Sequence, residues 1–372
     1  MPFAVPPPSY RPAWWVPGAH AQTLYGKFVR QPRSSRRLAR RPLPGYRTER
    51  WDTPDGDFVD IVRLAPELRA PRLLLLHGLE GGERSHYVQG LFGRARRMGW
   101  GMDLLVHRSC GGEMNRQRRF YHSGETTDLA MVVERVAAAQ PDRALILAGV
   151  SLGGNVLLKY LGERSSAPLG PHGPGATGGG ASAVALAPVP PNVRAAVAIS
   201  VPFDLARGAR HVGKGFSRIY ELNFLRSLVG KVEQKLAVYP DLVDRERIVG
   251  LRSLWDFDEV LTAAVHGFDG AEDYYARSSA LGFLGRIRVP TLLLSAVDDP
   301  FLPAEVLEEV RRVAEVNGCL TVEFHARGGH VGFVGGRVPW RPDYYAERRT
   351  FEWGVALGGG RSRPASRGIR PA

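Results

Sequence analysis

Short, uninterrupted apolar runs recur along this 372-residue chain, and they constrain its fold more than any other feature. Runs of this length are typical of strands that are buried on both faces of a parallel sheet. Apolar residues at helical spacing fill segments between them, as in 129–139 and 305–316. Strands that alternate with helices predict a mostly parallel α/β sheet with helices on both faces. The expected strands are 72–76, 101–106, 144–150, 195–201, 291–297 and 320–325.

Changes in composition divide the chain into five predicted parts. The helix-like, aromatic segment between the fourth and fifth strands is long enough to form a cap over one edge of the sheet. The stretch 164–192 is rich in Gly, Pro, Ala and Ser, lacks periodicity, and is expected to be a surface loop. The predicted parts are a Pro- and Arg-rich extended arm (1–50), the first part of an α/β core (51–202), a helical cap (203–285), the second part of the core (286–345) and a C-terminal segment with a basic tail (346–372).

The formal net charge of +13 is concentrated at the two ends of the chain. Residues 30–50 carry eight arginines and one acid, and 361–372 carry four arginines and no acid. A basic segment without interleaved aromatic residues is typical of a solvated flank, so specific nucleic-acid recognition is not expected. Such flanks could support weak, salt-sensitive association with an anionic membrane surface. A non-enzymatic protein that binds polyanions is the alternative of another class.

Other sequence features exclude several protein classes. Two cysteines, Cys110 and Cys319, cannot build a disulfide framework, and no CxxC or HExxH pattern indicates a zinc site. No apolar run approaches the roughly 18 residues of a membrane span. The N-terminal residues lack the pattern of a secretory signal, so a cytoplasmic location is expected. No metal or organic cofactor is expected, and the sequence does not indicate the oligomeric state.

A GxSxG motif at 149–153 follows one predicted strand and precedes a helix-like segment. In this context the motif predicts a sharp strand-to-helix turn that holds the Ser151 hydroxyl above the sheet. Side chains at Gly149 and Gly153 would collide with the neighbouring strand and helix, which explains the two glycines. The backbone N–H of Leu152 would point to where an oxyanion develops. Gly162 is expected to end the helix.

A serine nucleophile needs a base, and the chain order for this arrangement is serine, acid, histidine. His330 follows the last predicted strand and is the candidate base. Asp298 and Asp299 both follow the strand 291–297; loop spacing favours Asp299 as the acid and leaves Asp298 as the alternative. In the His-Gly loop 77–82, the backbone N–H of Leu79 is a candidate second oxyanion donor, while His77 is expected to shape the loop.

These residues resemble the α/β-hydrolase superfamily, and more specifically its YheT-like branch of predicted bacterial esterases and eukaryotic membrane-associated lipid hydrolases. The resemblance implies that Ser151 is the nucleophile, Asp299 the acid and His330 the base. One departure is Ser109, which stands where the branch usually has glycine. The matching stretches include 20–24, 77–82, 85–87, 108–115, 121–126, 151–155, 202–205, 257–258, 267–268 and 274–275.

The motif order predicts a serine hydrolase that cleaves a small-molecule carboxylic ester through an acyl-enzyme. A thioesterase and a lipid hydrolase acting on acylglycerols or phospholipids are alternatives with the same chemistry. Aromatic residues in the expected cap predict either an apolar acyl pocket or the cap's own core. They are Phe216, Tyr220, Phe224, Tyr239, Trp255, Phe268, Tyr274 and Tyr275.

Overall fold

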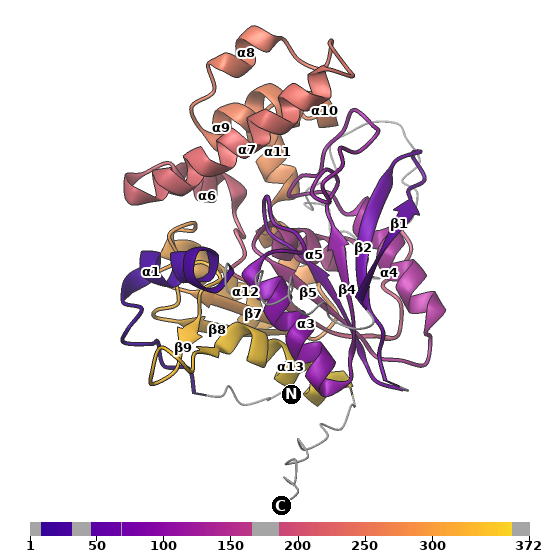
Figure 1. The fold of residues 1–372 in the computed structure, drawn as a ribbon, viewed down its shortest axis with the longest axis vertical. Coiled ribbons are helices and arrows are strands. Elements are labelled where there is room, and N and C mark those ends of the chain that lie inside the picture. The colour runs from indigo at the N-terminus through magenta and orange to yellow at the C-terminus, as the bar shows by residue number, and fades with distance from the viewer. Residues whose placement is uncertain (1–8, 32–45, 68, 166–185, 359–372) are drawn as a thin grey trace, which may run out of the picture.

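The computed structural model describes residues 9–31, 46–67, 69–165 and 186–358, which are organised around an eight-stranded sheet (Figure 1). The strand order is β1-β2-β4-β3-β5-β6-β7-β8. β1, β2 and β4 pair antiparallel, and the remaining neighbours pair parallel. The strands are β1 (Tyr46–Asp52), β2 (Phe58–Leu64), β3 (Arg72–Leu76), β4 (Gly101–Val106), β5 (Leu145–Val150), β6 (Val193–Ile199), β7 (Thr291–Ala296) and β8 (Leu320–His325).

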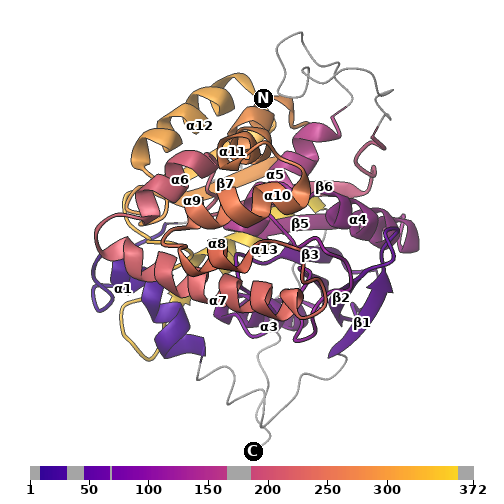
Figure 2. The same ribbon diagram turned by 90° about the horizontal axis from the view of Figure 1, so that it is seen from above.

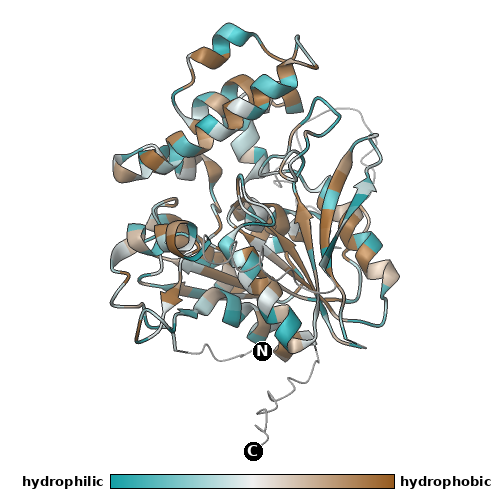
Figure 3. Ribbon diagram, viewed as in Figure 1, coloured by the Kyte–Doolittle hydropathy of each residue, from teal (hydrophilic) through white to brown (hydrophobic). Residues whose placement is uncertain are grey.

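Helices cover both faces of this sheet, as seen from above in Figure 2. Leu74 and Leu76 of β3 belong to one hydrophobic cluster, and Leu73 and Leu75 belong to the other. Successive side chains of a strand point to opposite faces, so four consecutive leucines are buried on the two faces of β3, and Figure 3 shows the central strands as hydrophobic. The predicted α/β fold is confirmed. One face packs on α4 (Thr127–Ala139), α5 (Leu152–Glu163) and α12 (Ala304–Val316), and the other packs on α3 (His86–Met98) and α13 (Tyr345–Gly358).

The hairpin β1–β2 was not predicted from the sequence. β1 reads Tyr-Arg-Thr-Glu-Arg-Trp-Asp and lies at the edge of the sheet, where most of its side chains remain partly or fully exposed. An edge strand needs no apolar run, so the signal that identified the buried strands is absent here. The six predicted strands lie within two residues of the observed ones; β6 ends before Ser200, whose φ of +49° breaks the extended backbone.

Part of the predicted extended arm is helical and packs on the core. α1 (Gly18–Tyr25) continues into the π-helical turn η1 (Gly26–Arg30). Gln22 is buried, and its side-chain amide donates to the carbonyls of Val16 and Val334 while its oxygen accepts from the Val334 amide. Tertiary contacts therefore stabilise this helix, which composition alone did not indicate.

A group of short helices lies above the carboxyl ends of the parallel strands (Figure 1). We propose that they form the predicted cap, and the division into five parts stays a proposal. Residues 166–185 of the glycine-rich stretch and 359–372 of the tail lie outside the described residues. The helices are α6 (Leu205–Val212), η2 (Gly215–Ser217), α7 (Arg218–Leu236), α8 (Arg245–Val249), α9 (Leu254–Phe257), η3 (Asp258–Thr262), α10 (Ala263–His266) and α11 (Ala271–Ser278); η4 (Ala280–Arg286) leads back to β7, and β9 (Val334–Gly335) pairs with β10 (Asp343–Tyr344).

The arginines of segment 30–50 that the structure describes are engaged in ion pairs. Their partners are carboxylates of the folded core or of the same hairpin, so these three side chains help to hold the structure together. The other arginines of this segment, and those of the tail, lie outside the described residues. The pairs are Arg30 with Glu347, Arg47 with Glu49, and Arg50 with Asp60 and Glu113.

The turn from β5 into α5 leaves no room for side chains at its glycines. A Cβ at Gly149 would lie 2.4 Å from the Gly153 carbonyl oxygen, and one at Gly153 would lie 2.5 Å from the His77 carbonyl oxygen. Gly162 does not end the helix as predicted, since α5 continues to Glu163. A Cβ at Gly162 would lie 2.5 Å from the Phe283 carbonyl oxygen, so this glycine is required by close packing inside the helix.

Gly153→Ala is expected to lower the free energy of unfolding by about 1–3 kcal/mol, because the new methyl group meets backbone atoms that cannot move aside. Gly230→Ala is the matched control: Gly230 lies within α7 and a Cβ there meets nothing within 4 Å. This control is expected to raise stability by up to about 1 kcal/mol. Urea unfolding of both variants measures the difference, and equal stabilities would contradict the packing argument.

Candidate active site

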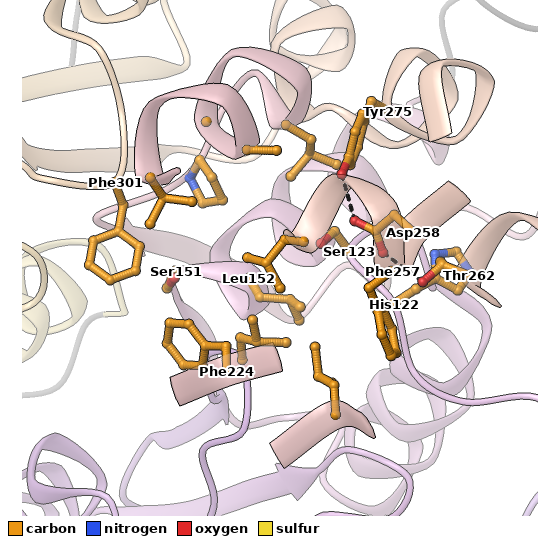
Figure 4. Close-up of a pocket in the computed structure, with 18 of the residues that line it drawn as sticks. His122, Ser123, Ser151, Leu152, Phe224, Phe257, Asp258, Thr262, Tyr275 and Phe301 are labelled. Atoms are coloured by element: carbon orange, nitrogen blue, oxygen red, sulfur yellow. Dashed lines mark hydrogen bonds between the residues drawn. The ribbon is translucent and has the colours of Figure 1, made fainter. Parts of the chain in front are cut away.

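Ser151 lies on the turn between β5 and α5, at the edge where the parallel strands end. Its φ of +53° and ψ of −121° are unusual for a residue with a side chain. Its amide donates to the Ile199 carbonyl at 2.8 Å, and its carbonyl accepts from the amides of Gly154 and Asn155 at 2.9 and 3.1 Å. These bonds fix the strained backbone and leave the hydroxyl on the wall of a cavity (Figure 4).

The structure brings Ser151, His330 and Asp299 together. His330 Nε2 lies 2.9 Å from Ser151 Oγ. His330 Nδ1 lies 3.0 and 3.1 Å from the two carboxylate oxygens of Asp299. With the proton on Nδ1, the imidazole donates to the carboxylate and offers a free nitrogen to the hydroxyl.

The neighbouring aspartates have different partners. Asp298 Oδ1 accepts from the amides of Gly328 and Gly329 at 2.8 and 2.9 Å, so it fixes the loop that carries His330. Asp299 contacts the imidazole itself, and one of its oxygens also accepts from the Phe301 amide at 2.9 Å. The geometry therefore favours Asp299 between the two candidates that the sequence left open.

Helix α1 holds the His330 loop, a contact that sequence reasoning did not identify. The His330 amide donates to Thr23 Oγ1 at 2.9 Å, and that hydroxyl donates to the Ala19 carbonyl at 2.8 Å. The Phe301 ring stacks on the imidazole with ring centroids 4.1 Å apart. The sequence signal for this contact is the stretch 20–24, which resembles the YheT-like branch but does not by itself indicate a role.

The two predicted oxyanion donors lie beside Ser151. Leu152 is the first residue of α5, where backbone amides have no partner within the helix. A Cβ on Gly78 would lie 3.1 Å from Ser151 Cβ, which puts the Leu79 loop against the serine. Within the described part of the chain, neither the Leu79 nor the Leu152 amide donates a hydrogen bond. Both N–H groups are therefore free to receive a ligand oxygen.

The peptide group between Gly78 and Leu79 is held in one orientation. The Gly78 carbonyl accepts from the Gly81 amide at 2.9 Å and from His77 Nδ1 at 2.8 Å. Because a trans peptide is planar, fixing the carbonyl also fixes the opposite direction of the Leu79 N–H. Burial lowers the pKa of His77 well below its usual value, so the ring is neutral and its Nε2 accepts from the His107 amide at 3.1 Å. His77 thus shapes the loop through hydrogen bonds.

Ser151 lies where two cavities meet. The first extends beneath the helices above the sheet and has a mostly apolar lining that includes Leu152, Phe224 and Phe257 (Figure 4). The second extends toward α1 and has a more polar lining. Leu79, Ser151, Phe224, Phe301 and His330 line both cavities.

Some aromatic residues of the expected cap line a pocket, and others form a core within the cap. Phe224, Tyr274 and Tyr275 line the first cavity, and Phe216 and Tyr220 line the second together with Phe224. Tyr239, Trp255 and Phe268 pack in hydrophobic clusters of the cap itself. Both an apolar pocket and a separate cap core are therefore present.

One carboxyl group lies in the wall of the apolar cavity. Asp258 accepts from Thr262 Oγ1 at 2.6 Å and from the Tyr275 hydroxyl at 2.7 Å (Figure 4). Burial raises the pKa of Asp258 to about 6, although both hydrogen bonds act in the opposite direction. Folding therefore makes ionisation of this carboxyl group less favourable than it is in the unfolded chain.

Ser109 takes a φ of +62°, so its turn keeps the left-handed backbone for which glycine is usual. Its hydroxyl donates to Asn115 Oδ1 at 2.6 Å, which supports the turn. Among the described residues no group of three His, Cys, Asp or Glu side chains could hold a metal ion. Within the same residues, no helix combines the length and apolar character needed to cross a bilayer.

No family model matches the chain. The predicted esterase YheT of Escherichia coli (strain K12) is 35% identical over 312 residues, which cover 82% of this chain and 83% of YheT. The chain belongs to the YheT-like branch of the α/β hydrolases. This α/β hydrolase is also similar to human phospholipase ABHD3, with 26% identity over 90% of this chain and 76% of that protein. A monoacylglycerol lipase of Saccharomyces cerevisiae is 27% identical over 77% of this chain and 60% of its own length.

Solved structures support the same fold. An esterase of Pyrococcus furiosus, Pf2001, superposes with a TM-score of 0.52 and 14% sequence identity, covering 84% of this chain and 91% of that chain. The relatives by sequence, and not this structural likeness, show that the α/β hydrolase is an enzyme of the serine ester hydrolase class.

The Tm of Asp258→Asn relative to that of the wild type is expected to increase as the pH rises. The folded-state pKa of Asp258 lies above the usual value, so wild type loses stability as the pH rises from about 4 through about 6, where the folded protein releases this proton. Asparagine keeps a carbonyl acceptor and does not ionise. Thermal unfolding of both proteins between about pH 4 and pH 8 measures the difference in Tm. A difference that stays constant over this range would contradict burial as the cause.

Proposed function

We propose that this enzyme cleaves carboxylic esters through Ser151, His330 and Asp299, with an acyl-enzyme intermediate. The observation that carries the proposal is the continuous chain of contacts from the Ser151 hydroxyl through both imidazole nitrogens of His330 to the Asp299 carboxylate. Relatives named as an esterase, a phospholipase and a monoacylglycerol lipase support ester chemistry.

The geometry supports the following sequence of steps. His330 Nε2 takes the hydroxyl proton as Ser151 Oγ attacks the ester carbonyl, and Asp299 stabilises the imidazolium that forms. The imidazolium then gives its proton to the leaving alcohol, whose bond to the acyl carbon breaks. A water molecule, deprotonated by the same nitrogen, then attacks the acyl carbon. The bond from this carbon to Ser151 Oγ breaks, Oγ takes the proton back from the imidazolium, and the acid is released. Each half-reaction returns the imidazole to its neutral form.

The negative oxygen of each tetrahedral intermediate would be bound by the amides of Leu79 and Leu152. Both lie beside Ser151, and neither donates to another group within the described residues. The Leu152 amide also lies at the N-terminus of α5, where the helix dipole favours negative charge. Backbone donors fixed in advance need no reorganisation as charge develops.

The two cavities suggest how an ester would bind. The apolar cavity beneath the cap suits an acyl chain, and the more polar cavity beside α1 suits the alcohol group. A lipid ester is therefore the second candidate substrate, and the mostly apolar lining of the first cavity is the observation that favours it. A thioester would fit the same chemistry.

Ser151→Ala is expected to abolish labelling by a fluorophosphonate probe and to lower kcat for a p-nitrophenyl ester by at least about 10⁴-fold, because the nucleophile is removed. Ser295→Ala is the matched control, since it removes a buried hydroxyl on β7 that has no hydrogen-bond partner among the residues that the structure describes. Labelling of the Ser151→Ala protein would refute the assignment. A failure of the probe to label the folded wild type and the Ser295→Ala control would also refute it.

An ion pair ties the proposed oxyanion loop to α7. Glu80 directly follows Leu79 and has a φ of +53°. Its carboxylate accepts from Lys231 Nζ at 2.6 Å and from the Tyr121 hydroxyl at 2.8 Å, and also from Ser227 Oγ. Lys231 and Ser227 both belong to α7. We infer that this helix positions the Leu79 amide through Glu80.

Lys231→Met is expected to lower kcat about tenfold with a smaller change in KM, since partial displacement of one oxyanion donor weakens transition-state binding. Lys159→Met is the control: it breaks a similarly buried pair with Glu163 within α5 and leaves the loop untouched. Steady-state kinetics of both folded variants make the comparison. An unchanged kcat for Lys231→Met would rule out the positioning role.

A further inference from the structure

The mouth of the second cavity lies between two elements that are far apart in the sequence. Lys27 and Phe28 of η1 line one side, and Phe216 of η2 and Ile219 of α7 line the other. Figure 1 shows α1 and the start of α7 on the same side of the molecule. The cavity leads from this mouth to Ser151.

Direct contacts join the two sides into one surface. His20 Nδ1 lies 3.0 Å from the Tyr220 hydroxyl, and the His20 ring lies 4.5 Å from the Phe216 ring, centroid to centroid. The surface therefore needs no further movement to present residues from both elements together.

Three large apolar side chains that line this cavity are exposed, and a fourth, Leu222, is exposed beside them on α7. Phe28 is 65% exposed, Phe216 50%, Ile219 56% and Leu222 44%. Leu222 lies one helical turn after Ile219, which itself lies three residues after Phe216, so the three share one side of the segment. We name these four residues the rim patch. Single exposed apolar residues are ordinary, but a group around a cavity mouth indicates a binding surface.

The exposed charges of the two segments that carry the rim patch have one sign, and Glu80, which also lines the cavity, is paired with Lys231. Segments 18–31 and 214–227 contain one acid, Glu221, which is buried. Their exposed charged side chains are Lys27, Lys214, Arg218 and Arg226. Arg218 is still 48% exposed although it lies 3.8 Å from Glu221. An apolar surface edged by cations complements an anionic lipid headgroup layer.

We propose that the rim patch and its cations dock this enzyme on an anionic bilayer, so that a lipid ester enters the second cavity directly from the membrane. The inference deepens the proposed function, on which it rests for the identity of the substrate. A second copy of the chain fits this surface less well. A twofold interface would place the same cations opposite one another.

Vesicle sedimentation tests the docking with Ser151→Ala protein, so that no lipid is consumed. The vesicles contain phosphatidylcholine and phosphatidylglycerol. Adding Phe28→Ser and Ile219→Ser is expected to lower the partition coefficient at least about tenfold, because two apolar contacts with the bilayer are lost. The matched control adds Val238→Ser and Val249→Ser, which change residues 67% and 86% exposed elsewhere on the cap. This control is expected to partition like the parent.

Three results would overturn the proposal. Equal partition of the rim and control variants would assign any binding to the arginine-rich flanks. No binding by the parent protein would exclude docking on these vesicles. A parent dimer that becomes monomeric in the rim variant, measured by light scattering, would assign the patch to self-association. Thermal unfolding verifies that both variants are folded.

The binding assay is independent of catalysis, so the two proposals can fail separately. If the vesicles bind through the rim patch but the wild-type protein hydrolyses no ester, the proposed function fails and the docking surface stands. Hydrolysis of soluble esters without rim-dependent binding would leave the proposed function and remove the docking surface.

Discussion

The candidate site depends on one constraint, the common edge at which the parallel strands end. The register pairs Leu76 of β3 with Gly149 of β5, Gly149 with Ala198 of β6, and Ala198 with Leu293 of β7. β7 in turn pairs with β8, which precedes His330. Residues that follow these strands therefore emerge side by side, although the chain separates Ser151 from His330 by 179 positions. Neither loop chemistry nor helix packing could bring these groups together if one strand shifted by a residue, because a shift exchanges the two faces of a strand.

Backbone strain is concentrated at this same edge. Glu80, Ser151, Ser200 and Val331 all have positive φ, and each follows a strand of the parallel sheet by a few residues. For a residue with a side chain, this backbone conformation raises the free energy of the folded state by about 1–2 kcal/mol, so surrounding contacts must stabilise it. Ser200 illustrates such a contact, since its hydroxyl accepts from the Val331 amide at 3.0 Å and fixes the loop after His330. Strain held in four neighbouring loops supports a functional interpretation of the edge.

The sequence predicted what depends on local pattern and missed what depends on tertiary contact. Buried strands such as β3 and β5 need nearly continuous apolar residues, so the apolar pattern of the sequence located them. The edge strand β1 and the helix α1 have no such requirement, and both were missed. The pair Asp298 and Asp299 shows the same limit. Both follow one strand, and only the fold determines which carboxylate faces the imidazole.

Helix α7 connects the proposed functions of this enzyme through polar contacts. The cap has hydrophobic clusters of its own, separate from the two that cover the sheet. On the side of α7 that faces the core, Lys231 Nζ donates to the Glu80 carboxylate. Lys235 Nζ donates to the carbonyls of Asn115 and Gln117 at 2.7 and 2.6 Å. Burial lowers the pKa of Lys235 to about 8, so an ammonium at this position is costly without its acceptors. Directional contacts of this kind specify one orientation of α7 on the core more strictly than apolar packing would. One helix therefore carries two residues of the proposed docking surface, Ile219 and Leu222, and the lysine proposed to position the oxyanion loop, Lys231.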